Sequence, residues 1–459
     1  MDIQSFRTPG LGDSTYLLTH DGAGILVDPQ RDFDRFLEQA DVDLRFVLET
    51  HLHNDYVSGG REAAARTGAK LVLPAASGAA FRHLPAFHLE DLPDEAFTVR
   101  PIHTPGHTPE HTSYLVLIDG EPVALFSGGS LLVGSAGRPD LLGMARADSL
   151  ARLQYTSVHR QAALGDGIGL YPTHGEGSFC TASGAGLYTS TIGAERRTSP
   201  VFAFPDADSF VAGQLAVLQP YPRYYAHMGP ANLMGPEPLP QATVSELTPH
   251  DVRRMQEEGA RVVDARPRDS FADGHIPGSL GVELRDDFGT WVGWLEPFNS
   301  PTVLVLDADQ DADEAIVQLQ RIGFDLVAGI LRSLDRWVLE GHPVDHLTTV
   351  SASELYGAIE SGEQVLDVRA PVEWDEGHFE ATRHVYVPEM VAGVPTGIDA
   401  DRPVWLMCAS GYRAMIAGGL LRRHGLDVRV LSAGGYTEAR QASAVWEAPC
   451  DAPLQAIGR

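Results

Sequence analysis

The second half of the chain contains the same segment twice, and this duplication constrains the fold more than any other feature. VVDARPRDSFADGHIPGS (Val262–Ser279) aligns with VLDVRAPVEWDEGHFEAT (Val365–Thr382), which begins 103 residues further along. An Asp, an Arg and a Gly-His pair coincide in the two segments. A period near 100 residues is too long for a solenoid repeat, so we expect two tandem copies of one small domain.

Each copy alternates short apolar runs with helical segments. The first copy has expected strands at Val262–Asp264 and Thr302–Leu306, and the second has them at Val365–Asp367 and Pro403–Met407. Strands that alternate with helices indicate a parallel sheet covered by helices.

The first 240 residues mix short strands with helices, which predicts an α/β layered domain. The expected strands are Tyr16–Leu18, Ile25–Val27, Leu44–Leu48, Leu71–Leu73, Tyr114–Ile118 and Val123–Phe126, and the expected helices are Asp32–Gln39 and Gly59–Thr67. Gly235–Thr248 is rich in proline and predicts a linker between domains. We therefore expect three domains, at residues 1–240, 247–345 and 350–459.

Charge and cysteine content narrow the setting in which the chain works. A net charge of −28 would repel phosphate backbones and anionic lipid, so we expect neither nucleic acid nor membrane as a partner. Three widely spaced cysteines do not form a disulfide framework, and the N-terminus shows no signal-peptide pattern. We expect a cytoplasmic enzyme that forms a homo-oligomer and acts on small molecules.

Histidines at strand ends predict a metal site in the N-terminal domain. His51 and His53 follow an apolar strand and, two residues apart, project from the same side. His107 lies in a Gly/Pro turn of HTPGHTPEH, and His174 ends another short strand. Neutral imidazoles are the commonest ligands for zinc and iron in proteins. For His51, His53 and His107 together, a metal site is a better interpretation than three unrelated structural histidines.

The motifs HLHND, PGHT and PTHG, in this order, resemble the metallo-β-lactamase superfamily. GGSLLVGSAGRPDLL (Gly128–Leu142) and HGEGSFC (His174–Cys180) are most similar to its persulfide dioxygenases, especially forms fused to rhodanese domains. The resemblance implies an αββα sandwich that uses Fe(II) and O₂ to oxidise a low-molecular-weight persulfide to sulfite.

Two positions depart from the superfamily. Tyr56 stands where the dinuclear hydrolases have a second-metal histidine, and Gly129 stands where they have a bridging Asp. A two-zinc hydrolase is therefore disfavoured, and the usual dioxygenase ligand set also lacks its Asp.

Because Gly129 has no side chain to bind a metal, another residue must supply the third ligand. We expect His51, His53 and His107 to hold one Fe(II) per chain, with zinc as the alternative metal and open positions for a thiolate and dioxygen. Asp140 or Glu176 is an alternative third ligand.

Other residues near the motifs have weaker assignments. Asp55 and His174 are expected to orient the ligand histidines or to bind metal themselves. Arg138 resembles a position that grips the carboxylate of the thiol carrier, and a loop salt bridge is the alternative. Cys180 is either a persulfide relay or a buried small residue.

The last copy carries a reactive cysteine. PVWLMCASGYRAMIAGGLLRRHG (Pro403–Gly425) predicts a strand that ends at Cys408, a tight loop, and a helix over 413–423. Loop N–H groups and the helix N-terminus stabilise a thiolate, and Arg413 adds a positive charge. Cys and Arg lie five positions apart, one fewer than in cysteine phosphatases, so the loop around Gly411 suits a single persulfide sulfur. This CxxGxR segment resembles the rhodanese family.

The middle copy lacks this equipment. Asp307 stands at the strand end where Cys408 stands in the last copy, and no Gly-x-Arg loop follows it. We expect an inactive domain that serves as a spacer or docking surface. Cys450, which has no basic neighbours, is interpreted as a bystander.

Together the motifs predict a persulfide dioxygenase joined to a sulfurtransferase in sulfide detoxification. Its small-molecule partners would be a glutathione or coenzyme A persulfide, sulfite and thiosulfate. Two alternatives remain: a zinc-dependent thioester hydrolase of the glyoxalase II kind, and a sulfur-carrier or scaffold protein whose N-terminal domain has lost catalysis.

Overall fold

The computed structural model describes residues 1–38, 42–175, 177–180, 187–240 and 244–446, and its chain divides into two compact units. The first unit comprises Met1–Ala242, Arg285–Asn299 and Asp313–Asp325. The second comprises Thr243–Leu284, Ser300–Ala312 and Leu326–Arg459. Within the described residues, no helix is both long enough and apolar enough to cross a bilayer.

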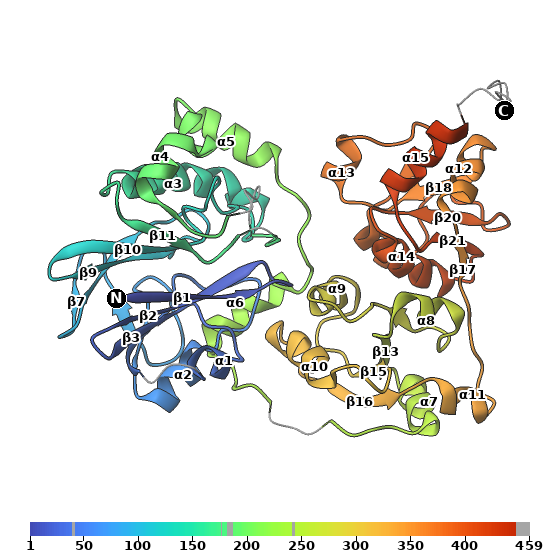
Figure 1. Ribbon diagram of the computed structural model, residues 1–459. Coiled ribbons are helices and arrows are strands. Elements are labelled where there is room, and N and C mark those ends of the chain that lie inside the picture. Colours follow the sequence, from blue (N-terminus) through green and yellow to red (C-terminus); the bar gives the residue numbers. More distant parts are fainter. Residues whose placement is uncertain (39–41, 176, 181–186, 241–243, 447–459) are drawn as a thin grey trace, which may run out of the picture. The chain divides into compact units, whose positions relative to one another are not determined.

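Two six-stranded sheets form the centre of the first unit (Figure 1). In spatial order, the strands of the first sheet are β1 (Asp2–Thr8), β2 (Asp13–His20), β3 (Ala23–Val27), β4 (Asp43–Leu48), β5 (Lys70–Pro74) and β6 (Leu84–Ala86). Those of the second sheet are β12 (Ser190–Thr191), β11 (Gly169–Pro172), β10 (Glu121–Gly128), β9 (Thr112–Ile118), β8 (Thr98–His103) and β7 (Leu92–Pro93).

The two sheets pack face to face because their strands alternate between two apolar faces. In β2, Tyr16 and Leu18 point into the core between the sheets, whereas Leu17 belongs to a second cluster on the outer face. In β4, Phe46 and Leu48 point inward and Val47 points outward. Burial on both faces explains why these strands are continuous apolar runs.

Helices cover both outer faces of the sandwich. Helices α1 (Asp34–Leu37) and α2 (Gly60–Thr67) pack on the first sheet, and α3 (Met144–Ala162), α4 (Ile192–Thr198), η1 (Pro200–Ala203) and α5 (Ala207–Ala216) pack on the second. The unit also contains α6 (Tyr225–Met234), α9 (Phe288–Leu295) and most of α10 (Ala312–Arg321). The expected αββα layering is confirmed. Helix α1 begins two residues after the predicted start at Asp32 and ends before Glu38, and the predicted end at Gln39 lies outside the described residues.

The second unit contains two parallel sheets with the same strand order. The middle copy forms β14 (Leu280–Gly281), β13 (Arg261–Asp264), β15 (Thr302–Leu306) and β16 (Val327–Arg332). The last copy forms β19 (Arg383–His384), β18 (Gln364–Asp367), β20 (Val404–Met407), β21 (Val428–Leu431) and an additional edge strand β17 (Thr348–Val350). A bridge from Glu246 to Ile330 takes the place of that edge strand in the middle copy. The parallel sheets expected from the repeat are confirmed.

The remaining helices of the second unit lie between or beside these strands along the sequence. They are α7 (Pro249–Glu257), α8 (Arg268–Asp273), α11 (Asp335–Leu339), α12 (Ala352–Glu360), α13 (Pro371–Asp375), η2 (Val387–Ala392), α14 (Tyr412–Arg422) and α15 (Tyr436–Trp446). Each copy has its own buried apolar cluster, centred on Val303 and Trp337 in the middle copy and on Val365 and Met407 in the last. The candidate functional residues are therefore the polar side chains at the ends of the strands, beyond these apolar clusters.

Candidate functional site

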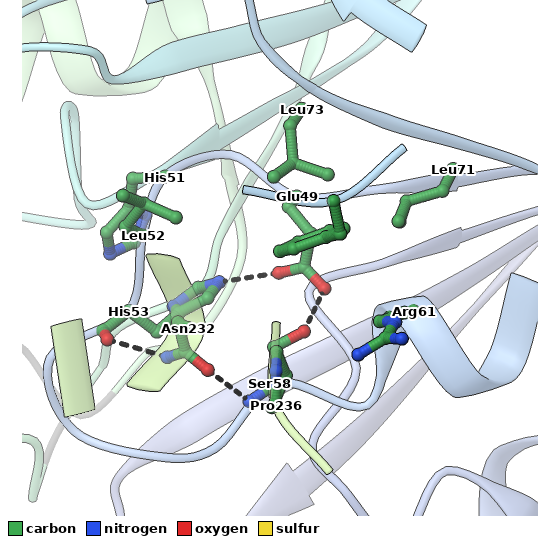
Figure 2. A pocket seen from close by; sticks show the side chains of 11 residues that line it. Glu49, His51, Leu52, His53, Ser58, Arg61, Leu71, Leu73, Asn232 and Pro236 are labelled. Atoms are coloured by element: carbon green, nitrogen blue, oxygen red, sulfur yellow. Dashed lines mark hydrogen bonds and ion pairs between the residues drawn. The ribbon is translucent and has the colours of Figure 1, made fainter. Parts of the chain in front are cut away.

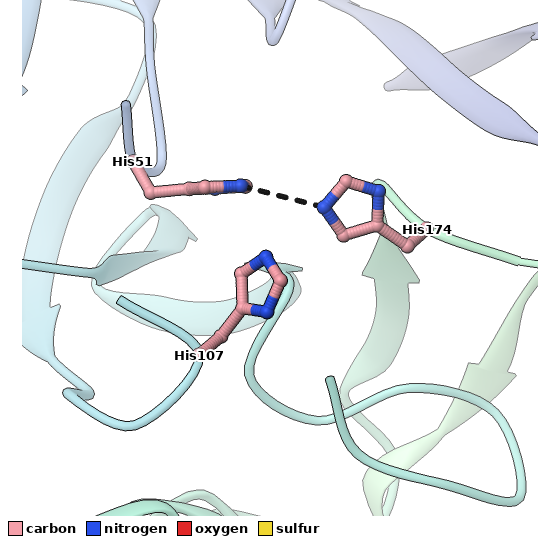
Figure 3. Close-up of side chains that lie close together, drawn as sticks. All are labelled: His51, His107 and His174. Carbon is pink, nitrogen blue, oxygen red and sulfur yellow. Dashed lines mark hydrogen bonds between the residues drawn. The ribbon is translucent and has the colours of Figure 1, made fainter. Parts of the chain in front are cut away.

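Three histidines from different loops meet at one end of the sandwich (Figure 3). His51 follows strand β4, His107 lies in the loop between β8 and β9, and His174 follows β11. Each of the three offers a ring nitrogen, and these nitrogens all lie within 4.8 Å of one another. The Nε2 atoms of His51 and His174 are 3.4 Å apart. The fold thus brings together residues that are separated by as many as 123 positions in the sequence.

The second nitrogen of each ring is held by an oxygen atom. Nδ1 of His51 is 2.9 Å from the Thr50 hydroxyl, Nδ1 of His107 is 2.9 Å from the Arg138 carbonyl, and Nδ1 of His174 is 2.8 Å from an Asp13 carboxylate oxygen. A ring that donates from Nδ1 keeps a lone pair on Nε2, which is the arrangement found at metal-binding histidines.

Burial keeps the three imidazoles neutral. It lowers the pKa of His51 and His107 well below the usual value, with a further contribution from neighbouring rings, and it also lowers the pKa of His174. Nε2 of His107 is buried and has no hydrogen-bond partner among the described residues. Three convergent lone pairs, one of them unpartnered, fit a metal ion that prefers nitrogen ligands.

His53, which we expected to complete the set, lies close to His51 and forms a further group of close ligand atoms with His51 and Asp28. Its Nε2 atom is 3.1 Å from Glu49 and 3.2 Å from Asp28, and the Tyr56 hydroxyl lies at 3.0 Å. Burial alone would lower its pKa, but the two carboxylates raise the pKa of His53 well above its usual value. An imidazolium has no lone pair to offer a metal. The Nδ1 atom of His53, however, is buried without a partner in the described part of the chain. The role of His53 as a ligand therefore stays a prediction.

Asp28 supports this site, and sequence reasoning missed it. It follows strand β3 with a φ of 51°, and its carboxylate accepts bonds from the Thr50 N–H and hydroxyl, both at 2.7 Å. The Thr173 hydroxyl also donates to it. Asp28 therefore fixes the residues that directly precede His51 and His174. Its place at the end of an apolar strand, like that of His51, is the signal that could have identified it.

Gly129, at the position of the superfamily's bridging Asp, lies directly against His107. A Cβ atom at this position would be 2.3 Å from the His107 ring. The Gly129 N–H donates to Nε2 of His111 at 2.9 Å, so that histidine is engaged within the protein. The ring of His107 therefore occupies the space that an aspartate would need, and the departure from the superfamily is built into the packing.

Asp55, expected to orient a histidine, belongs to a buried acidic group beside His174. One of its oxygens is 3.3 Å from Nδ1 of His174, and the Cys180 thiol donates to the same oxygen at 3.5 Å. Burial raises the pKa of Asp13 and Asp55 to about 7 and raises the pKa of Cys180 well above its usual value. Asp55, His174 and Cys180 form another group of close ligand atoms, so the thiol lies beside the candidate metal centre.

Arg138 and Asp140 bind each other. The guanidinium makes two bonds to the Asp140 carboxylate, at 2.7 and 2.8 Å, and also donates to the carbonyls of Phe179 and Gln219. Both side chains are buried. The structure therefore presents the loop salt bridge, and Asp140 is in none of the ligand groups formed by the described residues. Glu176, the other alternative ligand, lies outside the described residues.

A pocket borders His51 and His53 on the side of the first sheet (Figure 2). Apolar side chains, among them Leu71 and Leu73, line it together with Glu49 and Arg61. The Glu49 carboxylate accepts a hydrogen bond from Ser58 at 2.5 Å and is held on its other side by His53. The candidate metal centre is thus flanked by a pocket whose lining is mainly apolar.

A second candidate site lies in the last copy, where Cys408 directly follows strand β20. The Gly411 N–H donates to the Cys408 sulfur at 3.1 Å, and helix α14 begins at the next residue. Gly411 has a φ of 85°, and a Cβ atom there would lie 2.0 Å from the Ser432 carbonyl oxygen. Only glycine fits this position without strain. The predicted strand, loop and helix are all present, the helix one residue earlier than expected.

Arg413 is held beside this loop by a carboxylate that the sequence analysis did not identify. Its guanidinium makes two bonds to Glu373, at 2.5 and 2.7 Å. Burial would lower the pKa of Arg413, but Glu373, with Cys408 nearby, raises it overall. The positive charge is therefore permanent and fixed in position. The roles assigned to Cys408, Gly411 and Arg413 stay predictions, and Cys450 lies outside the described residues.

Family comparisons match most of the chain. Residues 8–174 match the metallo-beta-lactamase superfamily, and residues 248–340 and 351–442 each match the rhodanese-like domain. Among solved structures, a metallo-beta-lactamase from Staphylococcus aureus has a TM-score of 0.64 and 26% identity, covering 72% of this chain and 99% of that one. ETHE1 from Myxococcus xanthus has a TM-score of 0.44 and 26% identity, covering 50% and 98%.

Curated relatives match only part of the first domain. The hydroxyacylglutathione hydrolase of Acidiphilium cryptum is 40% identical over 116 residues, or 24% of this chain and 47% of that protein. The lactamase-like protein aptB of Emericella nidulans is 33% identical over 134 residues, or 26% and 40%. The chain thus spans less than half the length of these two relatives.

Proposed function

We propose that this chain, which joins a metallo-β-lactamase domain to two rhodanese-like domains, is an iron-dependent persulfide dioxygenase coupled to a sulfurtransferase. The first domain would oxidise a glutathione or coenzyme A persulfide at a centre held by His51, His107 and His174. Cys408 of the last domain would carry sulfane sulfur.

One observation carries the first half of this proposal: three neutral imidazoles converge through Nε2 while an oxygen holds each Nδ1. This set supplies one face of ligands to a single ion and leaves the other positions open. We assign His174 the third place because His53 is engaged by Glu49 and Asp28. A bound Fe(II) ion would supply the binding and activation of O₂.

The site fits one metal better than two. Tyr56 cannot replace the second-metal histidine, since its hydroxyl donates to the Asp28 carbonyl at 3.1 Å and also contacts His53. Gly129 offers no side chain to bridge two ions, and His107 fills the adjacent space. Dinuclear hydrolysis is therefore the weaker assignment.

The two proposed reactions balance and share sulfite. In the first, RSSH, O₂ and H₂O give RSH, SO₃²⁻ and two protons, so the outer sulfur is oxidised and O₂ is reduced. In the second, sulfite attacks the outer sulfur of the Cys408 persulfide; the S–S bond breaks, thiosulfate forms and the Cys408 thiolate leaves. Arg413 and the Gly411 N–H would stabilise the anionic sulfur in both its forms.

The decisive experiment is oxygen uptake by metal-defined protein. The chain, purified without oxygen and loaded with Fe(II), should consume one O₂ per glutathione persulfide and release sulfite, and the zinc-loaded chain should not. Iron-loaded protein without persulfide-dependent uptake would contradict the oxygenase and favour the scaffold alternative.

Metal content separates the ligand assignments. His174→Ala should lose most of its iron, since one of three ligands is removed, whereas His53→Ala should keep it. His103→Ala is the matched control, because the ring of His103 bonds to the Pro109 carbonyl at 3.1 Å and belongs to none of the ligand groups formed by the described residues. Full iron retention by His174→Ala together with loss in His53→Ala would restore the three-histidine set expected from the sequence.

A zinc-dependent thioester hydrolase is the second candidate, favoured by the similarity to hydroxyacylglutathione hydrolase. Asp55 and His174 are present as in the second-metal site of such enzymes. This alternative predicts that zinc-loaded protein releases thiol from an acyl-glutathione without consuming oxygen. Metal quantitation and the oxygen trace on one preparation distinguish the two functions.

A further inference from the structure

The Cys-less middle copy contacts the loop that carries Cys408. Arg268, the first residue of α8 in the middle copy, donates from Nη1 to the carbonyl oxygen of Ser410 at 2.8 Å. Ser410 lies two positions after Cys408, inside the loop that the rhodanese resemblance identifies as the sulfur-binding element. A residue of one domain thus holds the backbone of the other domain's candidate active site.

The bond reaches the cysteine through a single peptide group. The Ser410 carbonyl and the Gly411 N–H belong to the same planar unit, and in a trans peptide they point in opposite directions. The Gly411 N–H is the group that donates to the Cys408 sulfur at 3.1 Å. When Arg268 holds the carbonyl, it therefore also holds the N–H toward the sulfur.

We propose that Arg268 is a positioning residue for Cys408, acting from the inactive copy on the Ser410–Gly411 peptide. This inference rests on the proposed sulfurtransferase activity of Cys408. The guanidinium prevents a rotation of the peptide that would turn the Ser410 carbonyl oxygen toward an anionic sulfur. It also polarises the peptide, so that the N–H becomes a stronger donor to a thiolate or persulfide.

Neighbouring contacts keep Arg268 in place. Its Nε atom is 3.7 Å from the Glu283 carboxylate, and the Tyr412 hydroxyl donates to the Glu283 backbone carbonyl at 3.5 Å. On the next turns of α14, a Cβ atom at Gly419 would be 3.3 Å from the Phe271 ring, so the small residue permits the close approach of the middle copy. These contacts flank the Cys408 loop on the side of the middle copy.

The repeat itself shows that the relation is one-sided. The residue of the last copy that aligns with Arg268 is Pro371, which has no donor and begins α13. The middle copy therefore holds the arginine and the last copy holds the cysteine. This division gives the inactive domain a chemical reason to be present beyond that of a spacer.

Arg268→Ala in the full chain tests the inference, with Arg268→Lys as the conservative variant. The readout is the pH midpoint of Cys408 alkylation by iodoacetamide, followed at the Cys408 peptide by mass spectrometry. Loss of the oriented N–H should move the midpoint of Arg268→Ala upward by about half a unit to one unit. Thiosulfate:cyanide transferase kcat should fall about tenfold, whereas lysine, which can still donate to the carbonyl, should restore much of both.

Arg336→Ala is the matched control, because Arg336 lies in the same copy and forms an exposed pair with Glu340. It should leave both readouts unchanged. An Arg268→Ala variant with an unshifted midpoint and normal kcat would overturn the inference. The alkylation midpoint needs no turnover, so a wild-type chain without transferase activity would contradict the proposed function while this test of Arg268 still stands.

Discussion

The two rhodanese-like copies have the same sheet and the same internal salt bridge, yet they have different loops at the strand end that matters for chemistry. In the middle copy, the buried Arg266 side chain binds Asp264 at 2.6 Å and the Gly274 carbonyl at 2.7 Å. In the last copy, Arg369 binds Asp367 at 2.7 Å and the carbonyl of Gly377 at 2.7 Å. This Asp–Arg pair joins β13 and β18 to the Gly-His turn that follows each of them.

The loops after β15 and β20 differ in what fills them. In the middle copy, the Gln310 side chain accepts from the Asp307 N–H at 2.8 Å and donates to the Ala265 carbonyl at 2.8 Å. Arg332 closes the loop further by donating to the Gln310 carbonyl at 2.8 Å. In the last copy, the N–H of Gly411, three positions after Cys408, donates to the Cys408 sulfur.

This difference teaches that the fold and the chemistry are encoded separately. The Asp–Arg pair and the apolar strands are kept in both copies, while the nucleophile and its donor belong to a few loop residues in one of them. A copy that lacks the cysteine can close its loop with the side-chain hydrogen bonds of a glutamine. The middle copy can then position the Cys408 loop of the last copy, as we infer for Arg268.

The largest expected effect is the loss of sulfur transfer when the Cys408 thiol, which only the last copy has, is removed. Cys408→Ser should lower transferase turnover by about a thousandfold or more, because no other group in the loop can carry sulfane sulfur. Oxygen uptake with persulfide should persist, since it depends on the first domain. Asp307→Cys in the Cys408→Ser background should not restore transfer, since Gln310 occupies that loop. Thiosulfate:cyanide assays measure transfer, and an oxygen electrode measures uptake; joint loss in Cys408→Ser would contradict two separate sites.

The shared salt bridge should be equally costly to break in the two copies. Arg266→Ala and Arg369→Ala each leave a buried aspartate unpaired, which should cost about 3–5 kcal/mol of stability. Hydrogen exchange followed by mass spectrometry can compare peptides from β13 and β18, and each variant should weaken protection chiefly in its own copy. Arg336→Ala, at an exposed pair, should cost less than about 1 kcal/mol. Equal loss in both sheets from either variant would mean that the copies unfold as one.

A smaller effect should separate the aligned histidines of the two copies. His275 is 2% exposed, and burial lowers its pKa to about 4, whereas His378 is exposed. Because the folded pKa lies below the unfolded value of 6.5, the unfolded chain binds the proton first. The stability that the neutral His275 ring contributes is therefore present above pH 6.5. About 2–3 kcal/mol of it is lost as the pH falls toward 4.

Replacing His275 should reduce this acid sensitivity of the middle copy, so His275→Gln should show the effect and His378→Gln should not. Exchange protection of β13 and β18 peptides between about pH 7 and about pH 4 measures it, after correction for the intrinsic exchange rate. If the middle copy of the His275→Gln chain is as acid-sensitive as that of the wild type, His275 is not the cause.

The sequence predicts the fold because apolar strands and strand-end motifs are local signals. The strands around Leu17 and Val47 are recognisable from continuous apolar runs, and the repeat around Asp264 and Asp367 predicts the two parallel sheets. The sequence over-extends the short helix α1, because composition does not show where a helix ends.

Tertiary contacts, which the sequence does not show, determine which atoms hold each histidine ring. His53 has the expected spacing from His51, but Glu49 and Asp28 come from two adjacent strands and draw its ring into an ion pair. His174 joins the group because Asp13, 161 positions away, holds its Nδ1 atom. Contacts of this kind have no local signature, so spacing indicates that His51, His53 and His107 belong together but does not show which atoms hold each ring.

The smallest expected effect concerns the side chain that fills the middle loop. Gln310→Ala removes the acceptor of the Asp307 N–H and the donor to Ala265, which should cost about 1–2 kcal/mol, because water can reach part of this half-buried loop. Transfer at Cys408 should fall only if the loosened middle copy no longer presents Arg268 to Ser410. The Gln310→Ala chain should therefore show faster exchange after β15 and an unchanged pH midpoint for Cys408 alkylation. A shifted midpoint would show that the two loops are coupled, and the comparison would then have to treat the copies as one catalytic unit.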